Sequence, residues 1–228
     1  MKKTAVILSG GLGTRLRPFT NIMPKPLLPV GEKAVLEIQI EQLKEAGFTE
    51  IYLATNYKSN YIEKFFGNGA EYGVNLYISK EEKPLGTVGP IKLLEKKLQE
   101  PFLVMNGDIL TDLDFDELYQ FGVRQESNLT VAIKKMVMPF RFGNVNFNDD
   151  IVTGIVEKPD IVTYALAGIY IMKPGIFERI PNEERYNMDQ LMKEMLKNNV
   201  LISKYELENY WLDIGCDEDY KKAQEIFK

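Results

Sequence analysis

Residues 10–26, GGLGTRLRPFTNIMPKP, gather three glycines, two arginines, one lysine and three prolines directly after an apolar run. Glycines let main-chain N–H groups approach anionic oxygens closely, and a guanidinium matches a phosphate as a planar fork. Thr14 can add a hydroxyl, and Arg15 supplies the guanidinium. Lys25 stands between two prolines, which favour an extended backbone that holds its ammonium in place. The stretch therefore predicts a triphosphate-binding loop with a second cation, Lys25, that is held in place separately.

Two other interpretations of this loop stay open. A tight strand-to-helix turn would also need glycine, because glycine adopts left-handed backbone angles freely. A dinucleotide-binding fingerprint would need a third glycine where Leu16 stands, and Arg15 is out of place in it. A Walker A loop is excluded, because no Gly-Lys-Ser/Thr follows at the right distance.

Carboxylates are the candidate metal ligands, because divalent cations such as Mg²⁺ prefer hard oxygen donors. Asp108 follows the apolar run FLVMNG, which places its carboxylate at the carboxyl end of a predicted strand. The alternative role for Asp108 is to cap the next turn. Asp112, Asp114 and Asp116 precede a predicted helix, where we expect caps and a solvated face.

These residues flank a regular alternation of strands and helices. Short apolar runs predict strands over 5–9, 51–55, 75–79, 102–105 and 129–134. Periodic apolar positions predict helices over 35–46, 60–66, 87–98 and 115–124. AVILS and FLVM are continuously apolar, as central parallel strands covered on both faces are. We therefore predict an α/β fold with a doubly wound, mixed but mainly parallel sheet of Rossmann-like type.

The pattern changes after about residue 135. It predicts a hairpin around 148–150, a strand over 163–172, short helices over 175–180 and 188–197, a strand over 201–207 and a terminal helix over 218–227. No linker or repeat separates 1–135 from 136–228, so we expect one domain over 1–228. Ligands of such sheets bind where strands end, which directs attention to the loops after Ser9, Ser79 and Met105.

The composition of the chain argues against several classes of protein. A formal charge of −5 leaves no broad basic field for nucleic acid. The first apolar run is about six residues long, too short for a secretory signal, and no run approaches the roughly 20 residues that span a bilayer. A lone Cys216 cannot form an internal disulfide and fits a reducing compartment. We expect a cytoplasmic protein with no nucleic-acid or membrane partner.

Several stretches occur in a characteristic order: GGLGTRLRPFT with PKPLLPV, then KPLGTVGPI, NGD, VEKP and WLDIG. Together they resemble the sugar-1-phosphate nucleotidylyltransferases, and within that family their sequences resemble mannose-1-phosphate guanylyltransferases most. The chain resembles a short form without the left-handed β-helix of some members. The resemblance implies an enzyme that condenses an NTP with a sugar 1-phosphate, a hexose or heptose, and releases pyrophosphate. It also implies Mg²⁺ as cofactor and a tendency to form homo-oligomers.

The implied chemistry needs no general base, because a phosphate nucleophile is already ionised at neutral pH; the lack of histidine is therefore harmless. Catalysis reduces to positioning and charge stabilisation. The resemblance implies that Arg15 contacts the β- and γ-phosphates and that Lys25 contacts the reacting phosphates. It also implies that Asp108 and Asp213 bind the metal. It assigns a nucleotide-binding half, 1–135, and a sugar-binding half, 136–228.

The resemblance also assigns contacts residue by residue. The nucleotide contacts are Leu8, Gly10, Gly11, Gly13, Thr14, Arg15, Glu81, Pro84 and Gly86. The sugar-phosphate contacts are Lys25, Gly143, Glu157, Lys158 and Gly168. Glu157 would accept hydrogen bonds from sugar hydroxyls, and Lys158 would reach the sugar phosphate. The alternatives are an exposed Glu157–Lys158 ion pair at a strand end and a plain hairpin role for Gly143.

Glu81 is the residue that indicates which nucleobase the protein binds. A carboxylate only accepts hydrogen bonds, and guanine presents two adjacent donor groups, so GTP is favoured. Thymidylyl, uridylyl and cytidylyl transfer stay open, as does a merely solvated Glu81. Leu166 stands where relatives often carry asparagine, which favours an unusual sugar, for example a heptose or a modified hexose. The rival classes are a catalytically silent regulatory paralogue that binds the NDP-sugar and a Rossmann oxidoreductase.

Overall fold

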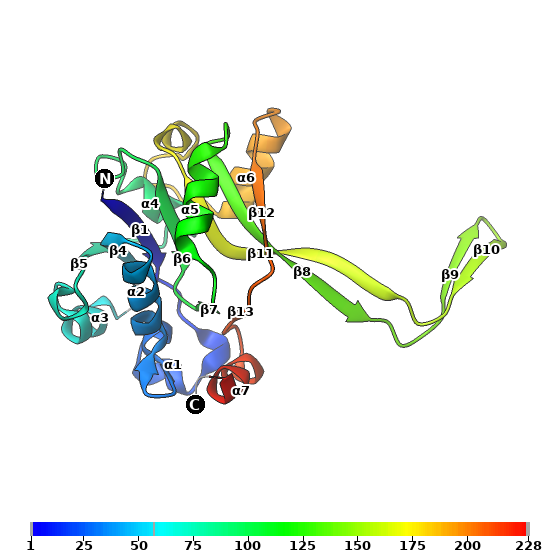
Figure 1. The fold of residues 1–228 in the computed structure, drawn as a ribbon, viewed down its shortest axis with the longest axis horizontal. Coiled ribbons are helices and arrows are strands. Elements are labelled where there is room, and N and C mark those ends of the chain that lie inside the picture. The colour runs from blue at the N-terminus through cyan, green and yellow to red at the C-terminus, as the bar shows by residue number, and fades with distance from the viewer. Residues whose placement is uncertain (1, 57, 227–228) are drawn as a thin grey trace.

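A mixed sheet of seven strands forms the centre of the protein in a computed structural model that describes residues 2–56 and 58–226 (Figure 1). Its strands are β1 (Lys3–Leu8), β4 (Phe48–Thr55), β5 (Asn75–Lys80), β6 (Phe102–Asn106), β8 (Leu129–Pro139), β11 (Asp160–Met172) and β12 (Ser203–Leu207). The order is β12-β8-β11-β6-β1-β4-β5. Only β11 runs antiparallel to its neighbours in this sheet. The predicted mixed, mainly parallel sheet is confirmed.

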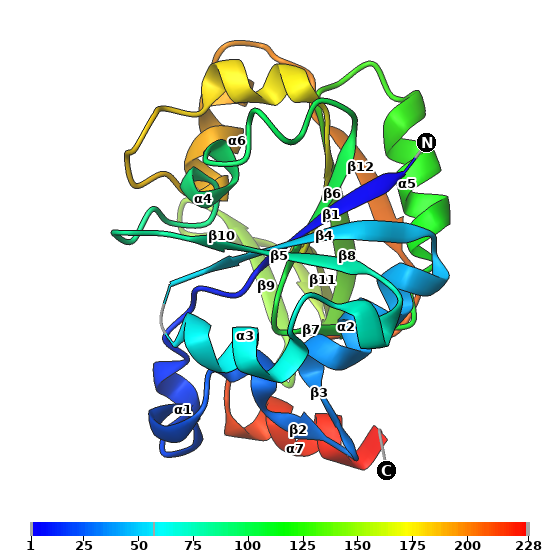
Figure 2. The same cartoon turned by 90° about the vertical axis from the view of Figure 1, so that its left-hand side faces the viewer.

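Helices cover both faces of this sheet (Figure 2). One face carries α2 (Val35–Glu45), α3 (Ser59–Phe66) and α5 (Phe115–Arg124). The other carries α4 (Gly89–Lys92), the 3₁₀ helix η4 (Pro174–Arg179) and α6 (Met188–Lys197). In β1, Val6 belongs to one core cluster and Ile7 to the other. This alternation explains why central strands read as continuous apolar runs.

Most predicted elements are present, with shifted ends. The helix predicted over 87–98 ends at Lys92 and continues as turns. The segment predicted as a helix over 175–180 is η4, because its N–H groups bond three residues back, as Ile176 does to Lys173. α7 (Asp217–Ile226) matches the terminal helix, whose predicted last residue, 227, lies outside the described residues.

Two small ribbons complete the body. β2 (Pro29–Val30) pairs with β3 (Lys33–Ala34), and β7 (Ile109–Thr111) pairs with β13 (Trp211–Asp213). A third core cluster, which includes Leu16, Leu110 and Ile214, packs α7 against the loop after β1. The C-terminal helix α7 therefore packs beside the loop after β1, where the sequence predicts the site.

An arm of residues 135–166 extends from the body (Figure 1). It consists of the outer parts of β8 and β11 and a hairpin of β9 (Asn144–Asn148) and β10 (Ile151–Val156). The hairpin predicted around 148–150 is confirmed. β8 was expected to end at 134, but it continues to Pro139, paired with β11. The division expected at 135/136 falls inside β8, so both halves contribute strands to one sheet.

None of the helices within the described residues combines the length and apolar character needed to cross a membrane.

A buried glutamine ties α2 to the end of β6. Gln39 is fully buried, and its Nε2 donates to the carbonyl oxygens of Asn106 at 3.0 Å and Ile109 at 2.8 Å. An unpaired buried carbonyl is costly, whereas an exposed one is satisfied by water. These two bonds therefore fix the turn that carries Asp108.

We expect Gln39→Leu to lower the free energy of unfolding by about 2 kcal/mol, since the buried Ile109 carbonyl and the part-buried Asn106 carbonyl lose their donor. Urea denaturation measures the change. Gln99→Leu is the control, because Gln99 donates to a backbone carbonyl at an exposed position. Equal stability of the two variants would contradict the positioning role of Gln39.

Candidate functional site

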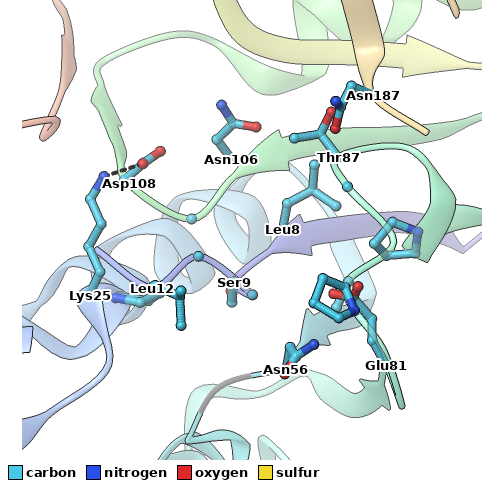
Figure 3. Close-up of a pocket in the computed structure, with 18 of the residues that line it drawn as sticks. Leu8, Ser9, Leu12, Lys25, Asn56, Glu81, Thr87, Asn106, Asp108 and Asn187 are labelled. Carbon is cyan, nitrogen blue, oxygen red and sulfur yellow. Dashed lines mark hydrogen bonds and ion pairs between the residues drawn. The ribbon is translucent and has the colours of Figure 1, made fainter. Parts of the chain in front are cut away.

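A cavity of about 420 Å³ opens where β1, β4 and β6 end (Figure 3). The loops after Ser9, Ser79 and Met105, expected to form the site, all contribute to its lining. Of the predicted site residues, it contains Leu8, Gly10, Gly11, Lys25, Glu81, Pro84, Gly86 and Asp108. The predicted residues that do not line it are Gly13, Thr14, Arg15, Gly143, Glu157, Lys158, Gly168 and Asp213.

The glycines of the first loop serve different needs. Gly13 has φ +58°, and a Cβ there would lie 2.7 Å from Thr20 Cγ2. Thr20 Oγ1 also donates to the Gly13 carbonyl at 2.8 Å, so Gly13 is required by the tight turn itself. Gly10 and Gly11 line the cavity, and Gly11 has open space beside it. The turn interpretation therefore holds for Gly13, while the other two leave the backbone accessible to a ligand.

Lys25 begins the 3₁₀ helix η2 (Lys25–Leu27), so the extended backbone expected at this residue is wrong. Pro24 is extended, but the Lys25 carbonyl accepts from the Leu28 N–H at 3.0 Å and closes one helical turn. The ammonium is still firmly held, because Lys25 Nζ forms an ion pair with Asp108 Oδ2. The Lys25 side chain is only 12% exposed.

The β7–β13 ribbon brings Asp108 and Asp213 together. Asp213 pairs with Ile109, and the Ile214 N–H donates to the Asp108 carbonyl at 3.0 Å. Burial raises the pKa of Asp213, and the negative charge of Asp108 raises it further. Lys25 and then Arg15 oppose these effects. The two carboxylates are therefore close enough to repel each other.

One oxygen of each carboxylate has no hydrogen-bond partner. Asp108 Oδ1 and Asp213 Oδ1 are both buried and unpaired. Buried polar atoms are ordinarily satisfied, so such a pair of anionic oxygens fits a cation. Within residues 2–56 and 58–226, no group of three or more acidic, cysteine or histidine side chains could hold a metal. A metal bound here would need further ligands besides these two carboxylates.

Arg15 lies at the margin of this cluster. It is exposed, on η1 (Thr14–Leu16), and a Cβ at Gly215 would lie 3.6 Å from its Nη2. Its positive charge opposes part of the rise in the pKa of Asp213. Arg15 therefore borders the carboxylates without lining the cavity.

Glu81 lies at the opposite end of the cavity from Lys25 and Asp108 (Figure 3). Its Oε2 accepts from the Leu85 N–H at 2.7 Å, and a Cβ at Gly10 would lie 2.9 Å from its Oε1. Burial raises the pKa of Glu81, and the Leu85 N–H partly offsets this. Glu81 is thus part of the cavity wall and not a freely solvated surface residue.

Gly86 is required by packing between two loops. It has φ +85°, and a Cβ there would lie 2.4 Å from Asn187 Oδ1 and 2.6 Å from the Tyr186 carbonyl oxygen. The Tyr186 N–H donates to Leu85, and the Val88 N–H donates back to Tyr186. These bonds place Arg185 and Asn187 in the cavity wall.

Sequence reasoning missed several lining residues. They are Ser9, Leu12, Pro26, Ala54, Asn56, Thr87, Pro90, Asn106, Gly107, Arg185 and Asn187. Asn106 and Gly107 belong to the NGD motif and could have been found there. A Cβ at Gly107 would lie 3.0 Å from the Leu8 carbonyl oxygen, so this glycine lets β6 approach β1. Arg185 follows an acidic segment in sequence and had no comparable signal.

A second cavity of about 290 Å³ shares Leu8, Thr87, Asn106 and Asn187 with the first. Its other lining residues are Leu166, Tyr170, Met188 and Asp189. Gly168 is buried beside it, with φ +71°, and a Cβ there would lie 2.6 Å from Asn106 Nδ2. Gly168 therefore lets β11 pack against Asn106.

The remaining predicted sugar-phosphate residues lie on the arm. Lys158 Nζ and Glu157 Oε1 are 3.9 Å apart, and both side chains are about 70% exposed. A Cβ at Gly143 would lie 3.1 Å from Glu157 Oε2, so these three residues are neighbours. Within one chain, they form an exposed group that lines neither cavity.

Comparisons with known proteins agree with the motifs. Mannose-1-phosphate guanyltransferase of Neurospora crassa is 37% identical over 95% of this chain, which spans 62% of that relative's length. HddC from Yersinia pseudotuberculosis is 30% identical, with a TM-score of 0.79 and coverage of 99% of this chain and 100% of that one. It has also been solved complexed with GMP-PN.

A putative glucose-1-phosphate thymidylyltransferase from Bacillus anthracis, solved in complex with a sucrose, is 26% identical. Its TM-score is 0.80, with coverage of 98% of this chain and 94% of that one. The nucleotidyl transferase family profile matches residues 4–228. The resemblance inferred from the motifs is therefore confirmed, and the chain belongs to the nucleotidyl transferase family.

Proposed function

We propose that this protein condenses GTP with a sugar 1-phosphate, a hexose or heptose, to give a GDP-sugar and pyrophosphate. The observation that carries the proposal is the cluster of Lys25, Asp108 and Asp213 beside the cavity, in which two carboxylate oxygens have no partner. Relatives named as guanyltransferases support the choice of reaction.

In the proposed reaction, an oxygen of the sugar phosphate attacks the α-phosphorus of GTP. A new P–O bond forms as the bond to the β-phosphate oxygen breaks, and pyrophosphate leaves with the electron pair. The nucleophile is already anionic, so the protein removes no proton. Its task is to offset the repulsion between two anions and to align them. Lys25, held beside Asp108, supplies a fixed positive charge for this purpose.

Asp108 and Asp213 would hold Mg²⁺ through the two oxygens that lack partners. The bound ion would neutralise phosphate charge, and phosphate oxygens or water would complete its ligands. The Lys25 ion pair uses Asp108 Oδ2 and so leaves Oδ1 for the ion. Arg15, at the margin, would extend the positive charge toward the β- and γ-phosphates.

The base would lie at the Glu81 end of the cavity. Oε2 already accepts from the Leu85 N–H, and Oε1 lies against Gly10, where an added Cβ would be only 2.9 Å away. A carboxylate acceptor matches the adjacent donors of guanine better than the single ring N–H of uracil or thymine. A complex of HddC with GMP-PN supports a guanine nucleotide. A cytoplasmic location is part of the proposal and is supported by the free Cys216.

We expect pyrophosphate release with Mg²⁺ to be fastest for GTP when GTP, ATP, CTP, UTP and dTTP are each paired with mannose, glucose and heptose 1-phosphates. The physical reason is the acceptor-only character of Glu81. A coupled phosphate assay measures the rates. A clear preference for another base would contradict the role of Glu81, and no release from any pair would contradict the proposed activity.

We expect Lys25→Ala to lower kcat by roughly 10²–10³-fold, because one fixed charge at the reacting phosphates is lost. Steady-state pyrophosphate release measures this change. Lys193→Ala is the control, since Lys193 also forms an ion pair but is exposed on α6. Equal activity of the two variants, or a gross loss of folding in Lys25→Ala, would show that Lys25 is structural.

We expect Asp213→Asn to raise the Tm of the metal-free protein at neutral pH. A carboxyl whose pKa is raised on folding stabilises the protein below its unfolded pKa, and this stability is lost as pH rises through the folded pKa. Removing the charge removes that neutral-pH penalty. The same substitution should abolish the increase in Tm that Mg²⁺ gives the wild-type protein.

Asp189→Asn is the matched control for Asp213→Asn. Lys193 lowers the pKa of Asp189, so its charge does not destabilise the fold at neutral pH. Its removal should not raise the Tm and should leave the Mg²⁺ response intact. A lower Tm for Asp213→Asn, or an unchanged Mg²⁺ response, would contradict the metal site.

A further inference from the structure

The arm, residues 135–166, concentrates the exposed apolar side chains of the protein. It carries 15 of the 25 large hydrophobic residues that are exposed among the described residues. Phe142, Phe147, Ile151 and Ile155 are each at least 70% exposed. No arm residue belongs to any of the three core clusters. Soluble monomers rarely expose an apolar surface of this extent, so we expect another surface to cover it.

Both faces of the arm are apolar. Met136, Val137 and Met138 follow one another in β8, and successive side chains of a strand point to opposite faces. Across the ribbon, Val137 pairs with Val162 and Met138 with Ile161. Strands that are apolar on both faces are typical of ribbons that are buried on both sides. A partner that contacted only one face of the arm would leave the apolar side chains of the other face exposed to water.

The edges of the arm are also unpaired. The pairing of β8 with β12 ends at Lys134, and the pairing of β11 with β6 ends at Ile169. Beyond these residues, within the described chain, β8 and β11 pair only with each other. Unpaired strand edges present free N–H and C=O groups to another surface. The arm therefore needs a partner for its backbone as well as for its side chains.

The charges of the arm and the apolar side chains beside the cavity favour a second copy of this chain as the partner. Residues 135–166 contain three cations and four carboxylates, so two arms do not repel each other strongly. On the body, Leu12 lines the cavity and is 59% exposed, and Ile22, at the end of the short helix α1 (Phe19–Ile22), is 70% exposed. These side chains give an arm an apolar surface to contact beside the cavity. A two-fold axis would make each such contact twice.

The arm also carries the predicted sugar-phosphate residues. Glu157, Lys158 and Gly143 are grouped on it and line neither cavity of their own chain. Leu166, at the base of the arm, is its only residue in the second cavity. Within the described residues, the lining of that cavity offers acceptor oxygens in Asn106, Asn187 and Asp189 but includes no lysine or arginine, so a sugar 1-phosphate bound there would need a cation for its phosphate. The site of a single chain is incomplete in this respect.

We propose that two copies exchange arms about a two-fold axis, so that Glu157 and Lys158 of one chain complete the sugar-phosphate site of the other. Lys158 contacts the sugar phosphate, and Glu157 accepts from sugar hydroxyls. The catalytic part of this inference rests on the proposed function. The exchange itself rests on the arm's exposed faces and edges.

The first test is the mass in solution by light scattering. We expect the wild-type protein at twice the 26.2 kDa of one chain. Phe147→Asp places a charge on the arm and should shift the mass to that of a single chain. Leu196→Asp, which alters an exposed leucine on the body, should leave the dimer intact. A single-chain mass for the wild-type protein, or an intact Phe147→Asp dimer, would overturn the exchange.

The second test asks which chain supplies the arm residues. Lys25→Ala and the double variant Glu157→Ala/Lys158→Ala are co-expressed with different tags, and the mixed dimer is purified through both. Each parent dimer should be nearly inactive. If the arms act in trans, the mixed dimer has one intact site and should show about half of the wild-type turnover. If they act in cis, it has none.

The outcomes separate this inference from the proposed function. An inactive mixed dimer beside an active wild-type dimer would overturn supply in trans, as would full activity of the Glu157→Ala/Lys158→Ala parent. An inactive wild-type dimer would overturn the proposed reaction, while the mass measurement would still decide whether the arms are exchanged.

Discussion

Two carboxylates of like charge lie together at the end of the central sheet, and much of the surrounding structure serves to hold them there. Asp108 follows β6, whereas Asp213 arrives from the far end of the chain through the β7–β13 pairing. Their mutual repulsion is opposed by Lys25 and, from the margin, by Arg15. Gln39 fixes the turn between β6 and β7 through its bonds to the Asn106 and Ile109 carbonyls. The residues that hold this charge cluster therefore come from five separate segments of the chain.

The cluster illustrates a conflict between stability and function. A raised pKa at Asp213 and unpaired oxygens on both carboxylates mean that the protein alone does not satisfy this site. Such features cost stability and persist where a ligand compensates for them. The cavity extends from this cluster to Glu81, so one end is charged and the other offers acceptors. This polarity matches a nucleoside triphosphate, whose phosphates and base differ in the same way.

The sequence predicted the central sheet well, because continuous apolar runs and helical periodicity are local signals. It also indicated the loops that form the cavity, through glycines and charged residues at strand ends. It did not indicate the β7–β13 ribbon, because three-residue strands have no usable periodicity. Arg185 and Asn187 were missed because loop packing at Gly86 brings them in. The backbone at Lys25 was misjudged, since one 3₁₀ turn overrode the preference of a residue before proline.

The most direct measurement is a crystal structure with Mg²⁺ and a non-hydrolysable GTP analogue. The account predicts an ion bound by Asp108 Oδ1 and Asp213 Oδ1, triphosphate oxygens near Lys25, and guanine beside Glu81. A triphosphate bound away from the loop after β1, or an ion that contacts neither carboxylate, would contradict it.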